Sequence, residues 1–105
     1  MADDAADIVA GWRRNVPPTV SKDEVEKVVH AYFTGAYTYG STGSHWIIVE
    51  HEALRIAWQR GWTSRIRGGT VSIPLTGGRH VKRVYIQNLL EAIDLKEAYD
   101  RAQEG

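Results

Sequence analysis

The sequence contains no cysteine, which excludes several kinds of site at once. A disulfide scaffold, a thiolate nucleophile and a cysteine-ligated zinc centre all require that residue. Its absence is compatible with a reducing compartment, and we expect a cytoplasmic protein. Long apolar runs are also lacking, since no stretch approaches the roughly 20 residues that cross a bilayer. The acidic first residues show no basic segment followed by an apolar run, so we expect neither a secretory signal nor a membrane partner.

Net charge is lacking too, because 13 basic residues balance 13 acidic ones, but the charges are unevenly distributed. No Asp or Glu occurs between Ala53 and Leu90. The basic residues of that stretch are Arg55, Arg60, Arg65, Arg67, Arg79, Lys82 and Arg83. A basic middle between acidic ends favours an anionic partner. A solvated basic surface that balances the acidic helices is an equally good interpretation.

The length of 105 residues fits one domain, and a hydrophobic content of 43% excludes compositional disorder. We expect residues 1–20 to be an N-terminal lead-in, helical from about Asp4 to Arg13 and interrupted at Pro17-Pro18. Residues 21–105 are then expected to form the single domain.

A capping-box pattern, Ser21-Lys22-Asp23-Glu24, opens the first long helix of that domain. Apolar residues follow it at helical spacing, namely Val25, Val28, Val29, Tyr32 and Phe33. Gly35 stands where a helix would end. The pattern therefore predicts a helix over 22–34.

The rest of the chain predicts a small sheet and a second long helix. Strands are expected at 36–41, 46–49 and 70–75, whereas residues 51–67 fit either a helix or a strand. Apolar spacing predicts a helix over 81–93, and Asp94 is expected to cap a last short helix. This order predicts an α+β fold with a three-stranded antiparallel sheet and both long helices on one face.

His45 is the leading candidate for chemistry, because it follows two small residues and enters an apolar strand. A phosphate could contact the Gly43 and Ser44 amides and the Ser44 hydroxyl, since nothing bulky shields them. Imidazole takes or gives a proton near neutral pH, which suits metal-free RNA cleavage by attack of a ribose 2′-hydroxyl on its own phosphate. Taken alone, the tripeptide favours a plainer interpretation, a histidine at a strand start that bonds to backbone.

A second candidate group surrounds His80, at the expected start of the helix over 81–93. Arg79, Lys82 and Arg83 flank it. The free amides of a helix N-terminus attract phosphate, whereas basic side chains there oppose the helix dipole. A bound anion therefore explains this group slightly better than a solvated helix start does.

The remaining histidines and aromatic residues give weaker signals. His30 is expected on the polar side of its helix, in solvent. His51 lies between two glutamates, but neighbours on a strand point to opposite faces, so we expect no metal site and no cofactor. Trp46 and Trp58 could stack on bases or pack in the core. The sequence indicates no role for the other two of its four tryptophans.

In their order, these motifs resemble the HicA (YcfA-like) toxins of bacterial toxin–antitoxin modules, over roughly residues 21–95. Each motif is short, so the order carries the resemblance. After the capped helix that ends in glycine come Gly43-Ser44-His45-Trp46-Ile47-Ile48, Val71-Ser72-Ile73-Pro74, Gly77-Gly78 and a basic lead into Val84-Tyr85-Ile86-Gln87-Asn88-Leu89-Leu90.

The resemblance implies a fold similar to a double-stranded-RNA-binding domain, α-β-β-β-α, with the helices packed on one face of a three-stranded antiparallel sheet. It also implies an mRNA endoribonuclease that needs neither a metal nor the ribosome, and a HicB-like antitoxin as protein partner. The functional histidine of the family maps onto His45. We consider His80 as a second proton carrier, and Arg79, Lys82 and Arg83 as ligands of the phosphate.

Three departures from the family pattern keep other functions open. Trp46 stands where members often carry a second histidine, the chain is neutral rather than basic, and the segment 50–69 is long. Each departure weakens the expectation of cleavage more than that of the fold, because a scaffold can lose chemistry and keep binding. The alternatives are a catalytically inactive module that binds RNA or an antitoxin, and an interaction domain that uses its aromatic surface without RNA.

Overall fold

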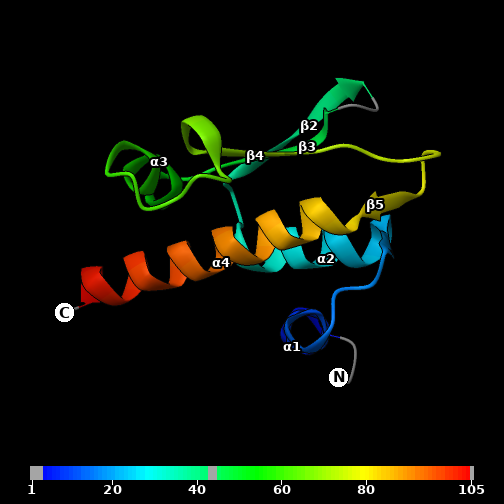
Figure 1. The fold of residues 1–105 in the computed structure, drawn as a ribbon, viewed down its shortest axis with the longest axis horizontal. Coiled ribbons are helices and arrows are strands. Elements are labelled where there is room, and N and C mark those ends of the chain that lie inside the picture. Colours follow the sequence, from blue (N-terminus) through cyan, green and yellow to red (C-terminus); the bar gives the residue numbers. More distant parts are fainter. Residues whose placement is uncertain (1–3, 43–44, 105) are drawn as a thin grey trace.

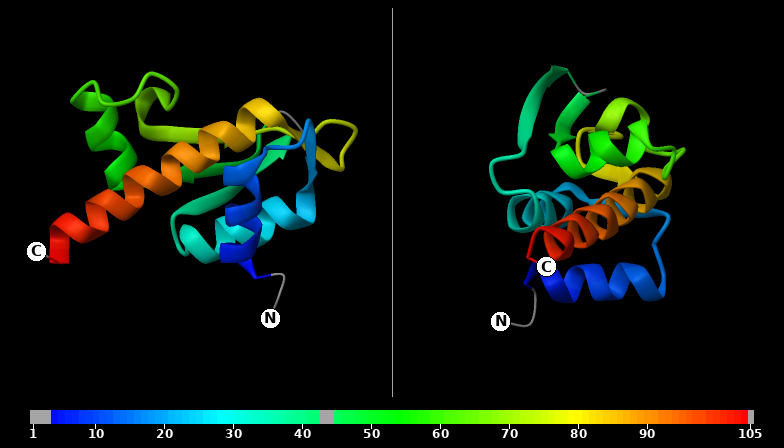
Figure 2. Two further views of the ribbon diagram at one scale, coloured as in Figure 1. Left: turned by 60° about the horizontal axis from the view of Figure 1, so that its bottom comes forward. Right: turned by 90° about the vertical axis from the view of Figure 1, so that its left-hand side faces the viewer.

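The computed structural model describes residues 4–42 and 45–104, which form an α+β fold in three layers (Figure 1). The first layer is an antiparallel sheet of β2 (Tyr37–Thr42), β3 (His45–Glu50) and β4 (Thr70–Ile73), with β3 in the centre. The second layer consists of α2 (Lys22–Tyr32) and α4 (Arg83–Glu104), which cover one face of the sheet. Beyond them, α1 (Ala5–Arg14) forms the third layer (Figure 2). The expected α+β class and the antiparallel three-stranded sheet are confirmed.

The hydrophobic core lies between the sheet and the two long helices. The register pairs Ile47 with Ile73 and Val49 with Val71, so these four buried side chains share one face of the sheet. The helices meet them with the buried residues Val25, Val28, Val29, Ile86, Leu89 and Ile93. Burial of each such side chain stabilises the fold by about 1.5–3 kcal/mol.

The predicted first long helix is present as α2. The Ser21 hydroxyl accepts a hydrogen bond from the Glu24 N–H at 3.4 Å, as the capping-box pattern predicts. The helix ends at Tyr32, and Gly35 follows with a φ of 76°, a conformation that glycine adopts without a steric penalty.

The segment that fitted either a helix or a strand contains α3 (Glu52–Gln59). Its first turn is capped by His51, whose Nδ1 accepts a hydrogen bond from the Ala53 N–H at 2.9 Å. Ala53, Leu54 and Ala57 are buried on the inner side of this helix. A histidine cap is not among the common N-cap residues, so the sequence carried no clear start signal. The short 3₁₀ turn η1 (Arg67–Gly69) then leads into β4.

A second sheet of two short strands was not predicted. β1 (Thr19–Ser21) pairs antiparallel with β5 (His80–Lys82), and Val20 lies opposite Val81. Each strand has three residues and one buried apolar position, which is too little for a periodic signal. Residues 81 and 82 therefore belong to a strand, and the helix expected over 81–93 begins at Arg83.

The expected break at Asp94 is wrong, because α4 continues from Arg83 to Glu104 without interruption. Arg13 of α1 donates a hydrogen bond to the Asp94 carboxylate at 2.7 Å, so the carboxylate is engaged away from the helix backbone. The hydrogen bond to Asp94 and the negative charge of that carboxylate raise the pKa of Arg13. The residues after Asp94 include good helix formers such as Leu95, Lys96 and Ala98, which allow the helix to continue.

The helix expected within residues 1–20 is present as α1 and packs against the rest of the chain. Asp4 caps it, accepting a hydrogen bond from the Asp7 N–H at 3.0 Å. Val9 and Trp12 are buried and belong to the same hydrophobic core as the helices beneath the sheet. Trp12, to which the sequence assigned no role, is thus a packing residue. No helix within 4–42 or 45–104 is both long and apolar enough to cross a membrane.

We expect Trp12→Ala to lower the free energy of unfolding by about 3–5 kcal/mol, since it removes a large buried side chain and leaves a cavity. Urea unfolding followed by circular dichroism measures this loss. Trp62→Ala is the matched control: Trp62 is 63% exposed, and its replacement should change stability by no more than about 0.5 kcal/mol. Equal effects of the two substitutions would contradict the packing of α1 described above.

Candidate functional site

His45 is the first residue of β3 and is exposed at one end of the sheet. Its Nδ1 lies 2.5 Å from the Ser72 hydroxyl oxygen of β4, within hydrogen-bond distance. A ring held through Nδ1 presents Nε2 to a ligand, the arrangement that general acid–base catalysis by histidine requires. Ser72 was noted in the sequence only as part of a strand, and no local pattern marked it as a partner of His45.

Gly40 brings β2 close to His45. A Cβ atom at residue 40 would lie 1.6 Å from the His45 carbonyl oxygen, so no larger residue fits without moving a strand. The ladder register also shifts between Tyr39 and Thr42, after which Thr42 pairs with His45. A shift of this kind lets a strand bend next to a site. Gly40 lies within β2, and its lack of a side chain permits the close approach to the start of β3.

The other two members of the tripeptide, Gly43 and Ser44, lie outside the described residues. Their proposed contact with phosphate therefore stays a prediction from the sequence.

The basic candidates occupy β5 and the residues on either side of it. His80 and Lys82 are exposed and flank the buried Val81, so the pleat directs them to the same side of the strand. Two backbone bonds hold this segment, from the Lys22 N–H to the Arg79 carbonyl at 2.9 Å and from the Arg83 N–H to the Pro18 carbonyl at 3.0 Å. The predicted cluster is thus carried largely by a strand rather than by a helix N-terminus.

His45 and this basic segment lie at the same end of the molecule. β3 starts where β4 ends, because the two strands are antiparallel, and the connection from β4 to β5 continues from that end (Figure 1). Within the described residues, Arg79, Lys82 and Arg83 form no ion pair with a carboxylate. Their charges are therefore available to an anionic ligand.

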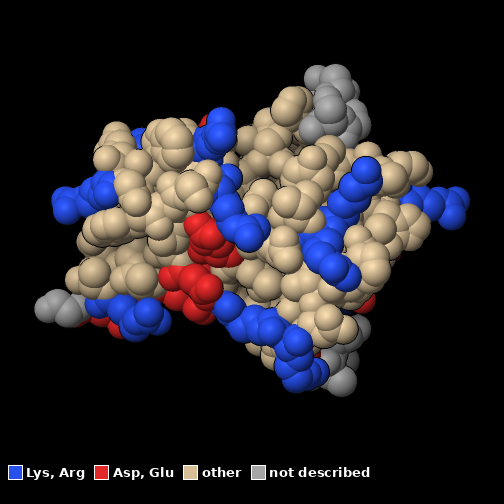
Figure 3. All heavy atoms as spheres, in the orientation of Figure 1, with Lys and Arg blue, Asp and Glu red and all other residues tan. Residues whose placement is uncertain are grey.

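Other arginines of the basic middle are engaged elsewhere. Arg55 pairs with Glu52 at 3.9 Å and Arg65 with Glu91 at 3.6 Å. Arg60 lies over the ring of Trp62, 5.5 Å from its centroid. Figure 3 shows the face of the molecule that is turned to the viewer in Figure 1. Lys and Arg are spread over that face rather than gathered in one patch, and acidic side chains lie near its middle. The run without acid in the sequence thus does not form one continuous basic surface on this face.

His30 is not simply solvated, as the sequence suggested. Its Nε2 lies 2.8 Å from the Tyr39 hydroxyl oxygen, and the same hydroxyl donates a hydrogen bond to Glu26. The His30 ring also stacks on Tyr37, with centroids 4.8 Å apart. Helix α2 and strand β2 therefore share a polar and aromatic contact close to His45.

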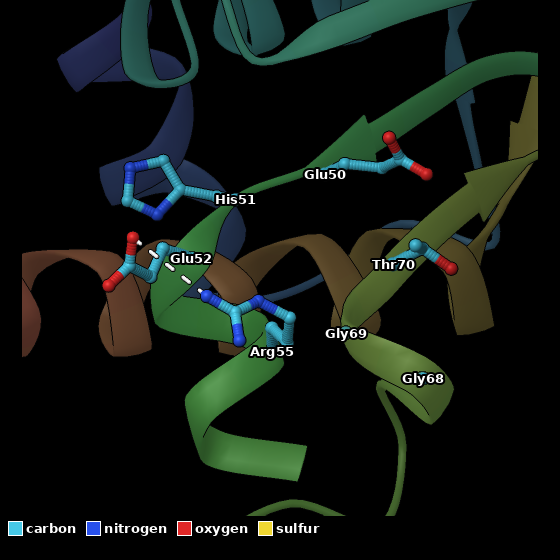
Figure 4. Close-up of a pocket in the computed structure, with 7 residues that line it drawn as sticks. All are labelled: Glu50, His51, Glu52, Arg55, Gly68, Gly69 and Thr70. Carbon is cyan, nitrogen blue, oxygen red and sulfur yellow. Dashed lines mark ion pairs between the residues drawn. The ribbon is translucent and has the colours of Figure 1, made fainter. Parts of the chain in front are cut away.

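A cavity of about 370 Å³ lies where β3 ends and β4 begins, at the other end of these strands from His45 (Figure 4). It is lined by Glu50, His51, Glu52, Arg55, Gly68, Gly69 and Thr70. Glu50 points away from His51 in Figure 4, and His51 is committed to capping α3. Among the described residues, no group of three or more His, Asp and Glu side chains could hold a metal ion. We therefore regard His51 as structural.

Comparisons of this chain with protein-family models, with curated proteins and with solved structures find no match. Fold and site together define a small α+β protein with an exposed, hydrogen-bonded histidine at one end of its sheet. At the same end of the molecule lie basic side chains that have no carboxylate partner among the residues that the structure describes.

We expect Gly40→Ala to lower the free energy of unfolding by about 1–3 kcal/mol, the usual range for an atom forced into occupied space. The His45 ring resonances in NMR spectra should shift as the strands separate. In the control Gly11→Ala, the new Cβ lies 4.0 Å from its nearest neighbour, in the middle of α1. That substitution should stabilise the protein by about 0.5–1 kcal/mol. Stabilisation by both substitutions would contradict the close approach at residue 40.

His51 should make stability depend on pH. Burial, followed by the nearby charge of Lys96, lowers the pKa of His51 in the folded protein. As the pH falls, the His51 ring therefore takes up a proton in the unfolded chain before it does so in the folded protein. The contribution of neutral His51 to the free energy of unfolding is complete above about pH 6.5 and decreases below that value. Urea unfolding measures the free energy of unfolding at about pH 7.5 and at about pH 5.5. Between these two pH values, His51→Asn, which retains a helix cap, should lose less of this free energy than the wild type does. A loss of the same size in both proteins would contradict this role.

Proposed function

We propose that this protein is an RNA-binding protein and a metal-independent mRNA endoribonuclease of a type II toxin–antitoxin module, with His45 as general base or general acid. The observation that carries the proposal is the contact between His45 and Ser72. It holds an exposed imidazole by one nitrogen and leaves the other free to exchange a proton with RNA.

The arrangement of the central elements supports the wider assignment. When α3 and β5 are set aside, the order α2, β2, β3, β4, α4 with both helices on one face is compatible with the α-β-β-β-α order that the resemblance implies. We infer that α1, α3 and the β1–β5 pair are additions to that core. The HicA-like assignment carries with it a cytoplasmic location and a HicB-like antitoxin that neutralises the toxin by binding it.

The basic segment would supply the phosphate ligands. Arg79, Lys82 and Arg83 have no carboxylate partner among the described residues, and His80 is exposed beside them. Positive charge around the phosphate stabilises the additional charge that develops in the transition state. His80 is our candidate for the second proton transfer.

One observation favours the inactive alternative. The residue after His45 is Trp46, which is partly buried against the core and cannot transfer a proton. A module that binds RNA or an antitoxin without cleaving RNA would keep the basic segment and lose only the chemistry.

The decisive test is incubation of RNA with the purified protein and with its His45→Ala variant in EDTA. We expect metal-independent cleavage by the wild type and a rate lower by about 10²–10⁴ in the variant, the usual contribution of a general acid or base. Ser72→Ala should reduce the rate less, because it frees the ring without removing it. Equal cleavage by wild type and His45→Ala, or no cleavage by either, would refute the role of His45.

A matched pair of charge variants tests the phosphate site. Lys82→Ala removes one charge from the basic segment, and Arg101→Ala removes one from the far end of α4. A plot of the logarithm of the RNA-binding constant against the logarithm of the salt concentration gives the salt dependence. We expect only Lys82→Ala to make the slope of this plot shallower, by about one unit. Equal changes in both variants would indicate a general charge effect instead. RNA binding without cleavage would favour the inactive module.

A further inference from the structure

A group of aromatic rings stands beside His45, and we call it the aromatic cluster. It consists of the partly buried Tyr37 and Trp46 and the exposed Tyr39 and His30. The rings of Tyr37 and Tyr39 meet edge to face with centroids 5.8 Å apart. The rings of Tyr39 and Trp46 are tilted by 55° at 6.5 Å. Tyr39 is 50% exposed. Half of a large aromatic side chain is therefore available to a ligand.

Hydrogen bonds hold Tyr39 in place. Its hydroxyl has one proton, which it donates to the Glu26 carboxylate, so the His30 Nε2–H must donate to the hydroxyl oxygen at 2.8 Å. His30 is in turn fixed by stacking on Tyr37 at an interplanar angle of 16°. An exposed tyrosine held by hydrogen bonds and by edge-to-face ring contacts loses little conformational entropy when it binds, which favours affinity.

The cluster adds no negative charge of its own. Desolvation among the neighbouring groups, followed by the hydrogen bond to Glu26, raises the pKa of Tyr39 to about 12. Tyr39 is therefore neutral at neutral pH and unsuited to act as a base. Its contribution to a binding site is the face of its ring.

Part of the cluster lies on the edge strand β2, and the chain reaches the basic segment from the other edge strand, β4. Tyr39 lies on the edge strand β2 opposite Ile47, two residues along β3 from His45. Strand geometry puts these backbone positions within about 10 Å of each other. Beyond β3, on the opposite edge, β4 leads to Arg79, Lys82 and Arg83. A ligand that runs from Tyr39 past His45 toward the connection between β4 and β5 would meet rings, then the histidine, then positive charge.

We propose that Tyr39 and Trp46 form a stacking site for an unpaired base of an RNA strand whose neighbouring phosphate lies at His45. The proposal rests on the function proposed above and specifies the substrate class, single-stranded RNA. A base can stack on these rings only when it is free of a duplex. The Glu26 carboxylate, which accepts the Tyr39 hydroxyl proton, would repel a phosphate placed against it, which favours a path of the RNA backbone toward the basic segment.

The test uses a fully 2′-O-methylated oligonucleotide of about ten nucleotides, a length typical of single-strand sites. It has no 2′-hydroxyl to attack the phosphate, so binding is measured whether or not His45 is catalytic. Fluorescence anisotropy at low salt compares the single strand with its blunt duplex. We expect tighter binding of the single strand, and a loss of about 5- to 150-fold in Tyr39→Leu and in Trp46→Leu.

Two variants separate stacking from a structural role. Tyr39→Phe loses the hydrogen bonds to Glu26 and His30 but keeps the ring, so it should lose less affinity than Tyr39→Leu. Trp62→Leu changes an exposed tryptophan near α3, at the other end of the sheet, and should have no effect on affinity. We also expect the oligonucleotide to quench the fluorescence of Trp46, so this quenching should disappear in Trp46→Phe. A purely structural contribution of Trp46 would not produce such quenching.

The outcomes distinguish the two proposals. Unchanged affinity in Tyr39→Leu and Trp46→Leu, or duplex binding as tight as that of the single strand, would overturn the stacking site and leave the nuclease proposal to the cleavage assay. Loss of affinity in both leucine variants, together with cleavage that does not depend on His45, would support the stacking site and overturn the catalytic assignment.

Discussion

The packing of one apolar face of the sheet against α2 and α4 is the constraint on which the rest of the structure depends. Ile47 and Val49 of β3 lie opposite Ile73 and Val71 of β4, and all four are buried against the helices. A slip of one residue would turn each of these side chains toward solvent, so the register is strongly determined. That register sets where β3 begins, and hence where His45 and Ser72 lie at the end of the sheet.

The two ends of β3 carry histidines with different roles because their surroundings differ. His51 follows the strand, is partly buried and caps α3, and its pKa is lowered by burial and by Lys96. His45 begins the strand, is exposed and contacts a serine hydroxyl. Burial commits the first ring to the fold, whereas exposure leaves the second ring available for the chemistry that we propose.

The proposed binding surface is a sequence of environments across the end of the sheet. Aromatic rings on β2 lie next to the Glu26 carboxylate of α2, and His45 stands on the central strand. After β4 come basic side chains that have no carboxylate partner within residues 4–42 and 45–104. This arrangement has a direction, because an RNA backbone is repelled at one edge and attracted at the other. The proposals for cleavage and for base stacking therefore describe one strand of RNA bound in one orientation.

The local signals in the sequence were sufficient for the capping box of α2, the strands around Ile47 and Val71, and the α+β class. Each of these depends on neighbours within a few residues, which a pattern records directly. The tertiary structure alone decided the contact of His45 with Ser72, the close approach of Gly40, the β1–β5 pair and the path of α4 past Asp94. Most of those features join residues far apart in the chain, such as Arg13 and Asp94, and only packing brings such groups within bonding distance. Gly40 and His45 are close in the chain, but a shift in the strand register decides their contact.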